Sequence, residues 1–209
     1  MRKGKLVVAA LAAMLIMAIG VGSASASRGF SPSASTFGAT ARALSFTGSN
    51  GVRVICDVTL GGSLHSTIAK TPGTLGGFIT SGRVAEERCT AAGGAERGRA
   101  TILQEGLPWH VTYNSFTGTL PSAVSGILVT VNNASFLLRV RVFFVEINCL
   151  YRGSIGAIIE GRGNNSFERI TVQLPNSIPV IAGQSEVCPP RGELNGFFTL
   201  TAPISITLV

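Results

Sequence analysis

The chain has few of the residues on which catalytic chemistry depends. Its 209 residues include two histidines and one tryptophan, and only 13% are charged. Asp57 is the sole aspartate, and the glutamates are scattered singly apart from Glu86-Glu87. The sequence contains no Gly-x-Ser-x-Gly nucleophile motif and no phosphate-binding Gly-rich loop. No pair of carboxylates can therefore be assigned to glycoside hydrolysis, and no catalytic constellation can be assigned from motifs.

Closely spaced cysteines are also missing. The four cysteines are Cys56, Cys89, Cys149 and Cys188. A metal site of four cysteines usually contains pairs two to four residues apart, so no metal or other cofactor is expected. An even cysteine number in an exported chain indicates disulfides instead. Three pairings are possible, and the favoured one is Cys56–Cys89 with Cys149–Cys188. In both favoured pairs the first cysteine ends an alternating apolar strand and the second opens a glycine-containing turn.

The N-terminus has the form of a secretory signal peptide. Arg2, Lys3 and Lys5 precede one apolar run, residues 6–19, and Ala24-Ser25-Ala26 follows it as a cleavage site. We expect residues 1–26 to be removed and the mature protein to be secreted, extracellular or attached to the cell envelope. The alternative is a membrane anchor, but the run is shorter than the roughly 20 residues that span a bilayer.

The mature chain has no cluster of basic residues. Without the three bases of residues 1–26 it carries 14 bases against 10 acids, a net charge of +4. Nucleic-acid binding requires a concentrated basic face, so we expect no nucleic-acid partner. Apart from Lys70 all these bases are arginines, a bias typical of bacteria with GC-rich genomes. The later apolar runs are too short for a transmembrane helix.

Helical periodicity is nearly absent. Only residues 82–89 could form one or two helical turns. Residues 27–42 are rich in Ser, Ala and Gly and are expected to be a flexible leader, with Phe30 and Phe37 as its candidate contacts to the domain. From residue 43 to residue 209, short Val, Ile, Thr and Phe runs alternate with Gly, Pro, Asn and Ser. The predicted strands are 43–47, 51–60, 63–70, 99–104, 108–114, 124–132, 135–148, 154–160, 168–174 and 196–208.

Turn signals separate these strands. Asn50-Gly51 predicts a tight hairpin in which both residues have positive φ. Asn132-Asn133 is expected to form a similar turn, and residues 161–165 another connection. Residues 71–77 and 175–190 hold most prolines and are predicted to be loops or sheet edges.

About ten strands with almost no helix predict an all-β, antiparallel fold. The expected architecture is a β-sandwich with two disulfides, and the alternative is a closed β-barrel. The cysteine contexts raise the further possibility that residues 43–115 and 137–208 are two similar halves. A transmembrane β-barrel is a third alternative, but it would carry aromatic girdles that the three Trp and Tyr residues cannot supply.

The segment Leu107–Tyr113 concentrates the candidate binding residues. Strand alternation places Trp109, Val111 and Tyr113 on one face and His110 with Thr112 on the other. An exposed aromatic face could bind sugars or peptides, but a lone tryptophan is more often a core residue, and this second interpretation is favoured. His65 is a weaker candidate on another strand.

The segments CDVTLGGSLHSTI, LPWHVTY and GTLP carry a loose resemblance. With them the chain resembles uncharacterised secreted, disulfide-containing β proteins of GC-rich Gram-positive bacteria. The resemblance implies an exported β domain and no activity, so it assigns no functional residue.

The leading functional hypothesis is a non-enzymatic, secreted or envelope-associated β domain. It would bind a partner, with a cell-envelope glycan or protein as candidates, or serve as a structural surface component. The alternatives are a secreted hydrolase that uses His65 or His110 with a carboxylate such as Asp57, and an outer-membrane β-barrel.

Overall fold

The computed structural model describes residues 28–173, 175–182 and 184–209. The predicted signal peptide, residues 1–26, lies outside this part of the chain. The described residues form thirteen strands and one 3₁₀ helix, η1 (Gln104–Gly106). The strands are β1 (Gly29–Pro32), β2 (Thr36–Gly48), β3 (Arg53–Leu64), β4 (Ile68–Ala69), β5 (Leu75–Ala92), β6 (Arg97–Ile102), β7 (Trp109–Thr119), β8 (Ala123–Val142), β9 (Val145–Gly161), β10 (Ser166–Val172), β11 (Ile178–Pro179), β12 (Arg191–Asn195) and β13 (Phe197–Leu208).

All of the described strands belong to one antiparallel sheet. The order β2-β3-β5-β7-β8-β9-β10-β13 returns to its start, because β13 also pairs with β2. Eight of the described strands therefore close into a ring, and the others extend it or pair beside it. The expected all-β, antiparallel class is confirmed, and the β2–β13 pairing gives the closed form of that class.

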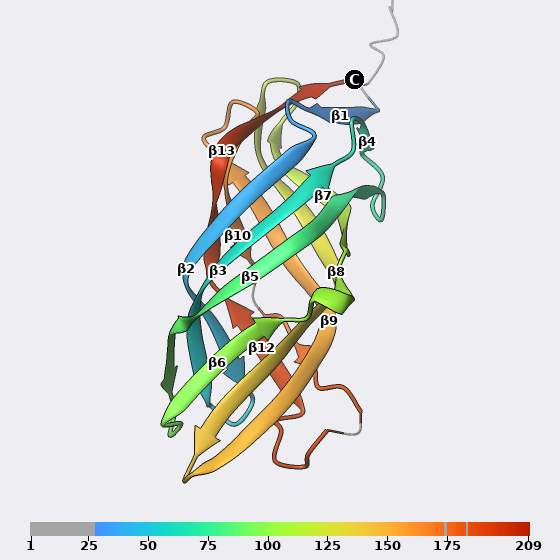
Figure 1. Cartoon of the computed structure of the whole chain (residues 1–209). Helices are drawn as coiled ribbons and strands as arrows, with labels where there is room; N and C mark the ends of the chain where they lie inside the picture. The colour runs from blue at the N-terminus through green and yellow to red at the C-terminus, as the bar shows by residue number, and fades with distance from the viewer. Residues whose placement is uncertain (1–27, 174, 183) are drawn as a thin grey trace, which may run out of the picture.

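The long strands β2, β3, β5, β8 and β9 are shared by the two ends of the molecule (Figure 1). At the upper end of Figure 1, β7 pairs with the first half of β8 and β13 with the first half of β2. At the lower end, β6 pairs with the second half of β8 and β12 with the second half of β2. Each end thus uses strands from both 43–115 and 137–208, so these sequence halves do not form separate bodies. Their proposed similarity stays a prediction.

Backbone irregularities in two long strands keep apolar side chains inside at both ends. Along β2 the buried positions change from Ala39 and Ala41 to Leu44 and Phe46, with Ala43 at φ 63° between them. The register with β3 shifts at the same place. One extra residue reverses the alternation of a strand, so the bulge keeps the core continuous.

Asn132-Asn133 forms the corresponding irregularity in β8. The predicted hairpin here is wrong, because both residues lie within the strand. Asn133 does adopt the left-handed conformation, at φ 61°, and the register with β9 shifts between Val131 and Ala134. The asparagine signal for positive φ was correct, but it marks a bulge.

Other local predictions have mixed outcomes. The Asn50-Gly51 hairpin joins β2 to β3, but of the two residues only Gly51 has positive φ, 85°. Residues 82–89 are part of β5 and are not helical. The predicted strand 135–148 is two strands, because the chain reverses at Phe143-Phe144. Residues 29–32 and 36–42, predicted as a flexible leader, are strand residues in β1 and β2, and Phe30 is fully buried.

Both disulfides have the favoured pairing. Cys56 on β3 is bonded to Cys89 on β5, and Cys149 on β9 to Cys188 in the segment between β11 and β12. The first bond links neighbouring strands, and the second holds an irregular segment against the sheet. Two disulfides indicate folding in an oxidising compartment. Over the residues that the structure describes, no helix has the length and hydropathy needed to span a bilayer.

Candidate functional site

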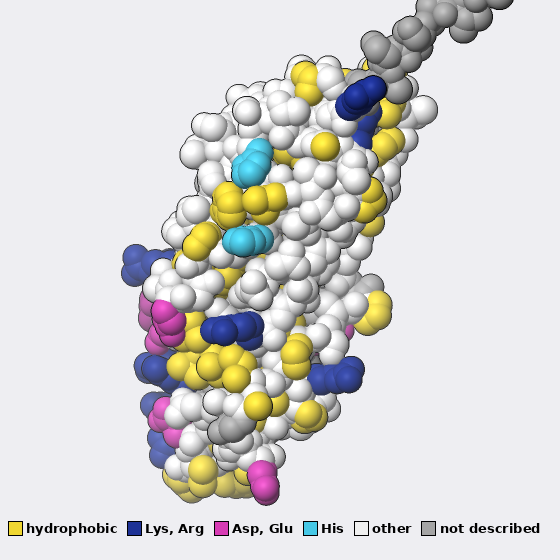
Figure 2. Space-filling model, turned by 90° about the vertical axis from the view of Figure 1, so that its right-hand side faces the viewer, with side chains coloured by type: hydrophobic (Ala, Val, Ile, Leu, Met, Phe, Trp, Pro, Cys, Tyr) yellow, Lys and Arg dark blue, Asp and Glu magenta, His cyan; other side chains and the backbone are white. Residues whose placement is uncertain are grey.

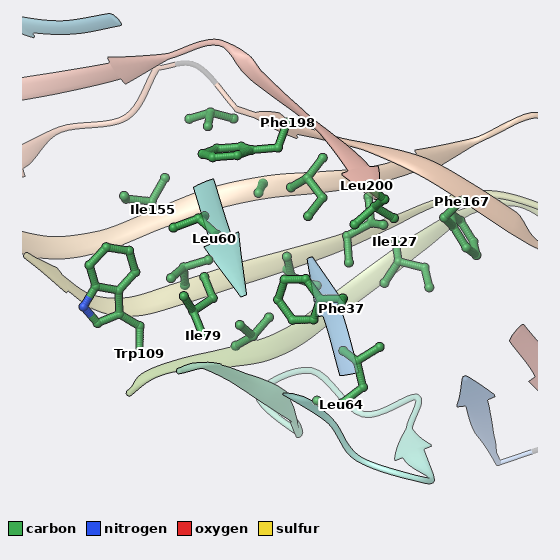
Figure 3. A pocket seen from close by; sticks show the side chains of 18 of the residues that line it. Phe37, Leu60, Leu64, Ile79, Trp109, Ile127, Ile155, Phe167, Phe198 and Leu200 are labelled. Atoms are coloured by element: carbon green, nitrogen blue, oxygen red, sulfur yellow. The ribbon is translucent and has the colours of Figure 1, made fainter. Parts of the chain in front are cut away.

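An apolar cavity of about 140 Å³ lies inside the strand ring. Its walls come from strands on all sides of the ring, and Figure 3 shows their side chains spread along the space between the strands, from Trp109 at one side to Phe167 at the other. No charged side chain of the described residues lines it. The labelled lining residues include Phe37, Leu60, Ile79, Ile127, Phe198 and Leu200.

Small side chains at inward positions leave this space open. Val129 on β8 and Ala157 on β9 are register partners, and both line the cavity. Val111 on β7 and Val131 on β8 are a second such pair. A ring of about eight strands is just wide enough for its inward side chains to fill the interior. Valine and alanine at several of these positions therefore leave a residual volume.

The size and lining of the cavity indicate which molecules it could hold. A cavity of about 150 Å³ lined by Leu, Ile and Phe stays dry and binds benzene or xenon. The cavity here has nearly that volume and the same kind of lining. A charged ligand would lose its hydration without gaining a partner, which is costly in free energy. The site is therefore suited to a small neutral, apolar group.

Trp109 and Tyr113 line the cavity from β7. Both are buried, with Trp109 only 2% exposed, and Val111 lies on the same inward face. The predicted alternation and the core position of Trp109 are confirmed. The Trp109 ring packs edge-on against Phe136 at 5.3 Å, and Phe136 packs in the same way against Phe46 at 5.2 Å. Trp109 thus connects the cavity to the core of the lower end.

Polar groups are scarce around the cavity. Tyr113 carries the only hydroxyl among the described lining side chains, and its burial raises the pKa of the phenol above the ordinary value of 10.0. The Nε1 of Trp109 and the Oγ of Ser135 are buried and have no hydrogen-bond partner among the described residues. Trp109 Nε1 points away from the other labelled lining residues (Figure 3). These groups therefore offer little specific polar recognition.

The two histidines lie on the outer surface. His65 and His110 both contact Phe78 of β5, with ring centroids 5.6 Å and 5.2 Å apart, respectively. Figure 2 shows the histidines on one face, with hydrophobic side chains between them. In the described part of the chain, no hydrogen bond or ion pair joins either imidazole to a carboxylate. Among the same residues, no group of three or more His, Cys, Asp and Glu side chains could hold a metal ion.

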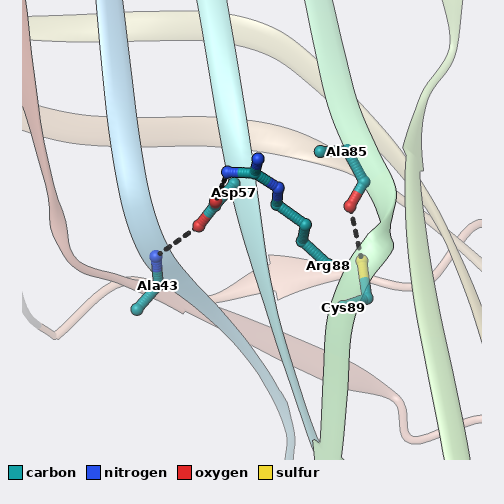
Figure 4. Close-up of polar contacts among 5 residues, drawn as sticks. All are labelled: Ala43, Asp57, Ala85, Arg88 and Cys89. Carbon is teal, nitrogen blue, oxygen red and sulfur yellow. Dashed lines mark hydrogen bonds and ion pairs between the residues drawn. The ribbon is translucent and has the colours of Figure 1, made fainter.

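Asp57 stabilises the bulge between β2 and β3. Its carboxylate accepts a hydrogen bond from the Ala43 backbone N–H at 3.2 Å and another from Arg88 Nη1 at 3.2 Å (Figure 4). These contacts, the Ala43 bond first, lower the pKa of Asp57 below its ordinary value of 3.8. His65 is eight positions further along the chain, about 26 Å in a strand. Asp57 is therefore not placed to act with that histidine.

Arginines surround Asp57 in a shallow surface hollow. The hollow has a volume of about 400 Å³ and is lined by Arg42, Arg83, Arg88 and Glu87 together with Asp57. It is larger than the interior cavity, but its charges partly compensate one another, and Asp57 is already bound to Arg88. We therefore take the apolar interior cavity as the candidate site.

Comparison with known proteins supplies no further assignment: the chain matches no family model, no curated protein and no solved structure.

The sequence indicated Trp109 and Tyr113 as candidate binding residues but did not predict the cavity. The available signal was the repeated use of valine and alanine at inward positions of β8 and β9, such as Val129 and Ala157. That signal becomes informative only when the ring closure is known.

Proposed function

We propose that this protein is an exported, non-enzymatic binding domain that holds a small apolar molecule inside its strand ring. The apolar cavity inside the strand ring carries the proposal, because its lining is apolar and its volume is close to that of a known benzene-binding cavity. A bacterial secreted or envelope location belongs to the same proposal. It is supported by the two disulfides and by the signal-peptide pattern of residues 1–26.

The ligand class follows from the lining. An aromatic ring or a short branched alkyl group would fill the space and replace contacts that the empty cavity lacks. A hydroxyl on such a ligand would find no partner among the described residues, because the cavity wall that they form presents no polar atom. A carboxylate or an ammonium group is disfavoured, because the described lining residues offer no opposite charge.

Benzene and xenon are the probes for this proposal. Purified, disulfide-bonded protein is titrated with benzene, and binding is followed by calorimetry and by chemical shifts of the Trp109 and Tyr113 rings. We expect saturable binding and a higher melting temperature with benzene, because a ligand that binds only the folded state stabilises it. Xenon should shift the same side-chain resonances.

A cavity-filling variant provides the decisive comparison. Ala157→Leu adds a larger side chain to the lining and should abolish benzene binding. The matched control is Ala202→Leu at an exposed position of β13, which should bind as the wild-type protein does. Leu200→Ala enlarges the cavity and should retain benzene binding and admit larger rings. The proposal fails if the wild-type protein does not bind benzene, or if Ala157→Leu and Ala202→Leu bind it equally.

A further inference from the structure

The β8–β9 hairpin ends in an exposed aromatic tip, formed by Phe143, Phe144 and Val145. Phe143 is 82% exposed and Phe144 81% exposed, and Val145 beside them is also exposed. The hairpin projects at the lower end of Figure 1, and Figure 2 shows hydrophobic side chains at the same end. The hydrophobic effect opposes leaving two neighbouring phenylalanine rings in water.

The backbone of this turn adds a second cost. Val142 and Val145 are paired, so Phe143 and Phe144 form a two-residue hairpin loop with φ angles of 46° and 67°. Such loops favour Asn-Gly, because a bulky side chain is strained at positive φ. The chain thus places two phenylalanines where the turn disfavours them and where water surrounds them. Strain of this kind at an exposed site points to a function.

Arginines lie directly above the tip. On the paired strands β6 and β8, Arg97 is opposite Arg141 and Arg99 is opposite Arg139. Like charges directly opposite one another destabilise a sheet, and Glu146, the register partner of Arg141 on β9, offsets only part of this repulsion. Along β8 the two arginine levels are about 7 Å apart. Basic side chains therefore extend from the aromatic tip up one outer face of the lower end.

These arginines are only partly neutralised. Arg141 lies 3.8 Å from Glu96, and Arg99 lies 3.8 Å from Glu86, distances too long for hydrogen bonds. The Nε of Arg141 is buried without a hydrogen-bond partner among the described residues, and its guanidinium lies over the Phe144 ring at 5.6 Å. Arg141 is thus a partly exposed cation, ion-paired with Glu96, immediately behind an exposed aromatic ring.

We propose that the Phe143-Phe144 tip inserts into the surface of a lipid bilayer that contains anionic headgroups. The two rings would enter the boundary between headgroups and acyl chains, where aromatic side chains are favoured. Arg141 and Arg97 would then lie at the level of the lipid phosphates. Arg139 and Arg99 would lie about 7 Å further from the bilayer interior. An anionic bilayer is the partner that fits, because its apolar interior and its negative headgroups occur in the same order as the apolar tip and the basic flank. The proposal is independent of the interior cavity.

A double variant separates insertion from folding. Phe143→Asn with Phe144→Gly installs the residues that the turn prefers, so the free energy of unfolding should rise. Binding to vesicles of phosphatidylcholine with phosphatidylglycerol, measured by flotation, should nevertheless fall about tenfold or more, because two apolar rings are lost. A variant with merely damaged structure would lose stability and binding together.

Matched controls test the two parts of the tip. Phe197→Asn removes another exposed phenylalanine that lies under an arginine, Arg169 at 4.5 Å, and should leave vesicle binding unchanged. Arg97→Gln with Arg141→Gln should weaken binding to the anionic vesicles and reduce its dependence on salt, with little effect on pure phosphatidylcholine vesicles.

Several outcomes would overturn the membrane proposal. The first is wild-type protein that does not float with anionic vesicles, and the second is equal flotation of the Phe143→Asn, Phe144→Gly variant. A third is sedimentation that shows a wild-type dimer, in the absence of lipid, which this variant abolishes. That last result would identify the tip as a contact between two copies of the chain.

Discussion

At the scale of single residues, Asp57 shows how one carboxylate stabilises an irregular backbone. It binds the N–H of Ala43, whose φ of 63° is unusual for alanine, and the side chain of Arg88. The sequence identified Asp57 only as a candidate catalytic carboxylate. Its structural contacts depend on the β2–β3 register, and that register could not be predicted from residues 43 and 57 alone.

Asp57 gives a prediction about pH. Because the folded state lowers its pKa below 3.8, the ionised group stabilises the fold above that pH, and the contribution is lost as the pH falls through the lowered pKa. Urea unfolding should show Asp57→Asn less stable than wild type at neutral pH. The difference in the free energy of unfolding between the variant and the wild type should become smaller below about pH 4. A gap that is constant between neutral pH and strongly acidic pH would contradict this role, and Glu146→Gln on β9 serves as the exposed-carboxylate control.

Ser135 gives a second prediction at this scale. Its side chain is fully buried, and its Oγ has no hydrogen-bond partner among the described residues. Ser135→Ala removes the unsatisfied hydroxyl and should stabilise the fold by about 1 kcal/mol. Equilibrium denaturation measures the change. A loss of about 1 kcal/mol or more would instead show that the hydroxyl is satisfied, for example by bound water.

At the scale of elements, bulges decide which face of a long strand meets the core. β8 has inward residues on both sides of Asn132-Asn133, and the bulge reverses the alternation between Val131 and Ala134. The sequence pattern located the left-handed residue but not the continuation of the strand. A hairpin and a bulge use the same local conformation, and only the pairing of β8 with β9 along its full length distinguishes them.

This bulge can be tested at Asn133. Asn133→Gly should leave stability almost unchanged, because glycine adopts positive φ readily. Asn133→Val should cost about 1–2 kcal/mol, because a β-branched side chain is strained there. Thermal and chemical unfolding of the two variants gives the comparison. Equal stabilities would show that the backbone of β8 relaxes without the left-handed residue.

At the scale of the whole molecule, the two disulfides and the ring closure determine the fold. Their closed loops have sequence separations of 33 and 39 residues, and each bond should contribute about 3–4 kcal/mol in the chain-entropy model. The ring itself depends on β2 and β13, elements from near the two ends of the described chain. Such distant pairing leaves no local signature in the sequence.

The proposed export leads to a prediction about the mature product. When the full chain is expressed in a bacterium with a Sec pathway, the exported protein should begin at Ser27 and contain no free thiol. Intact mass and N-terminal sequencing measure the first property, and thiol titration under native conditions measures the second. A product that retains residues 1–26, or four reactive sulfhydryls in the native protein, would contradict the proposed processing or oxidation.

The sequence by itself determined the strand-rich class, and it favoured a core position for Trp109 and one of the three possible cysteine pairings, which the structure then confirmed. Each of these follows from local alternation or from residue type, which act over a few positions. Only the tertiary structure decided that β13 returns to β2, that Val129 and Ala157 face one cavity, and that Phe143-Phe144 forms a projecting turn. Those features depend on which distant segments become neighbours, because the free energy of strand pairing and core packing is shared across the whole sheet.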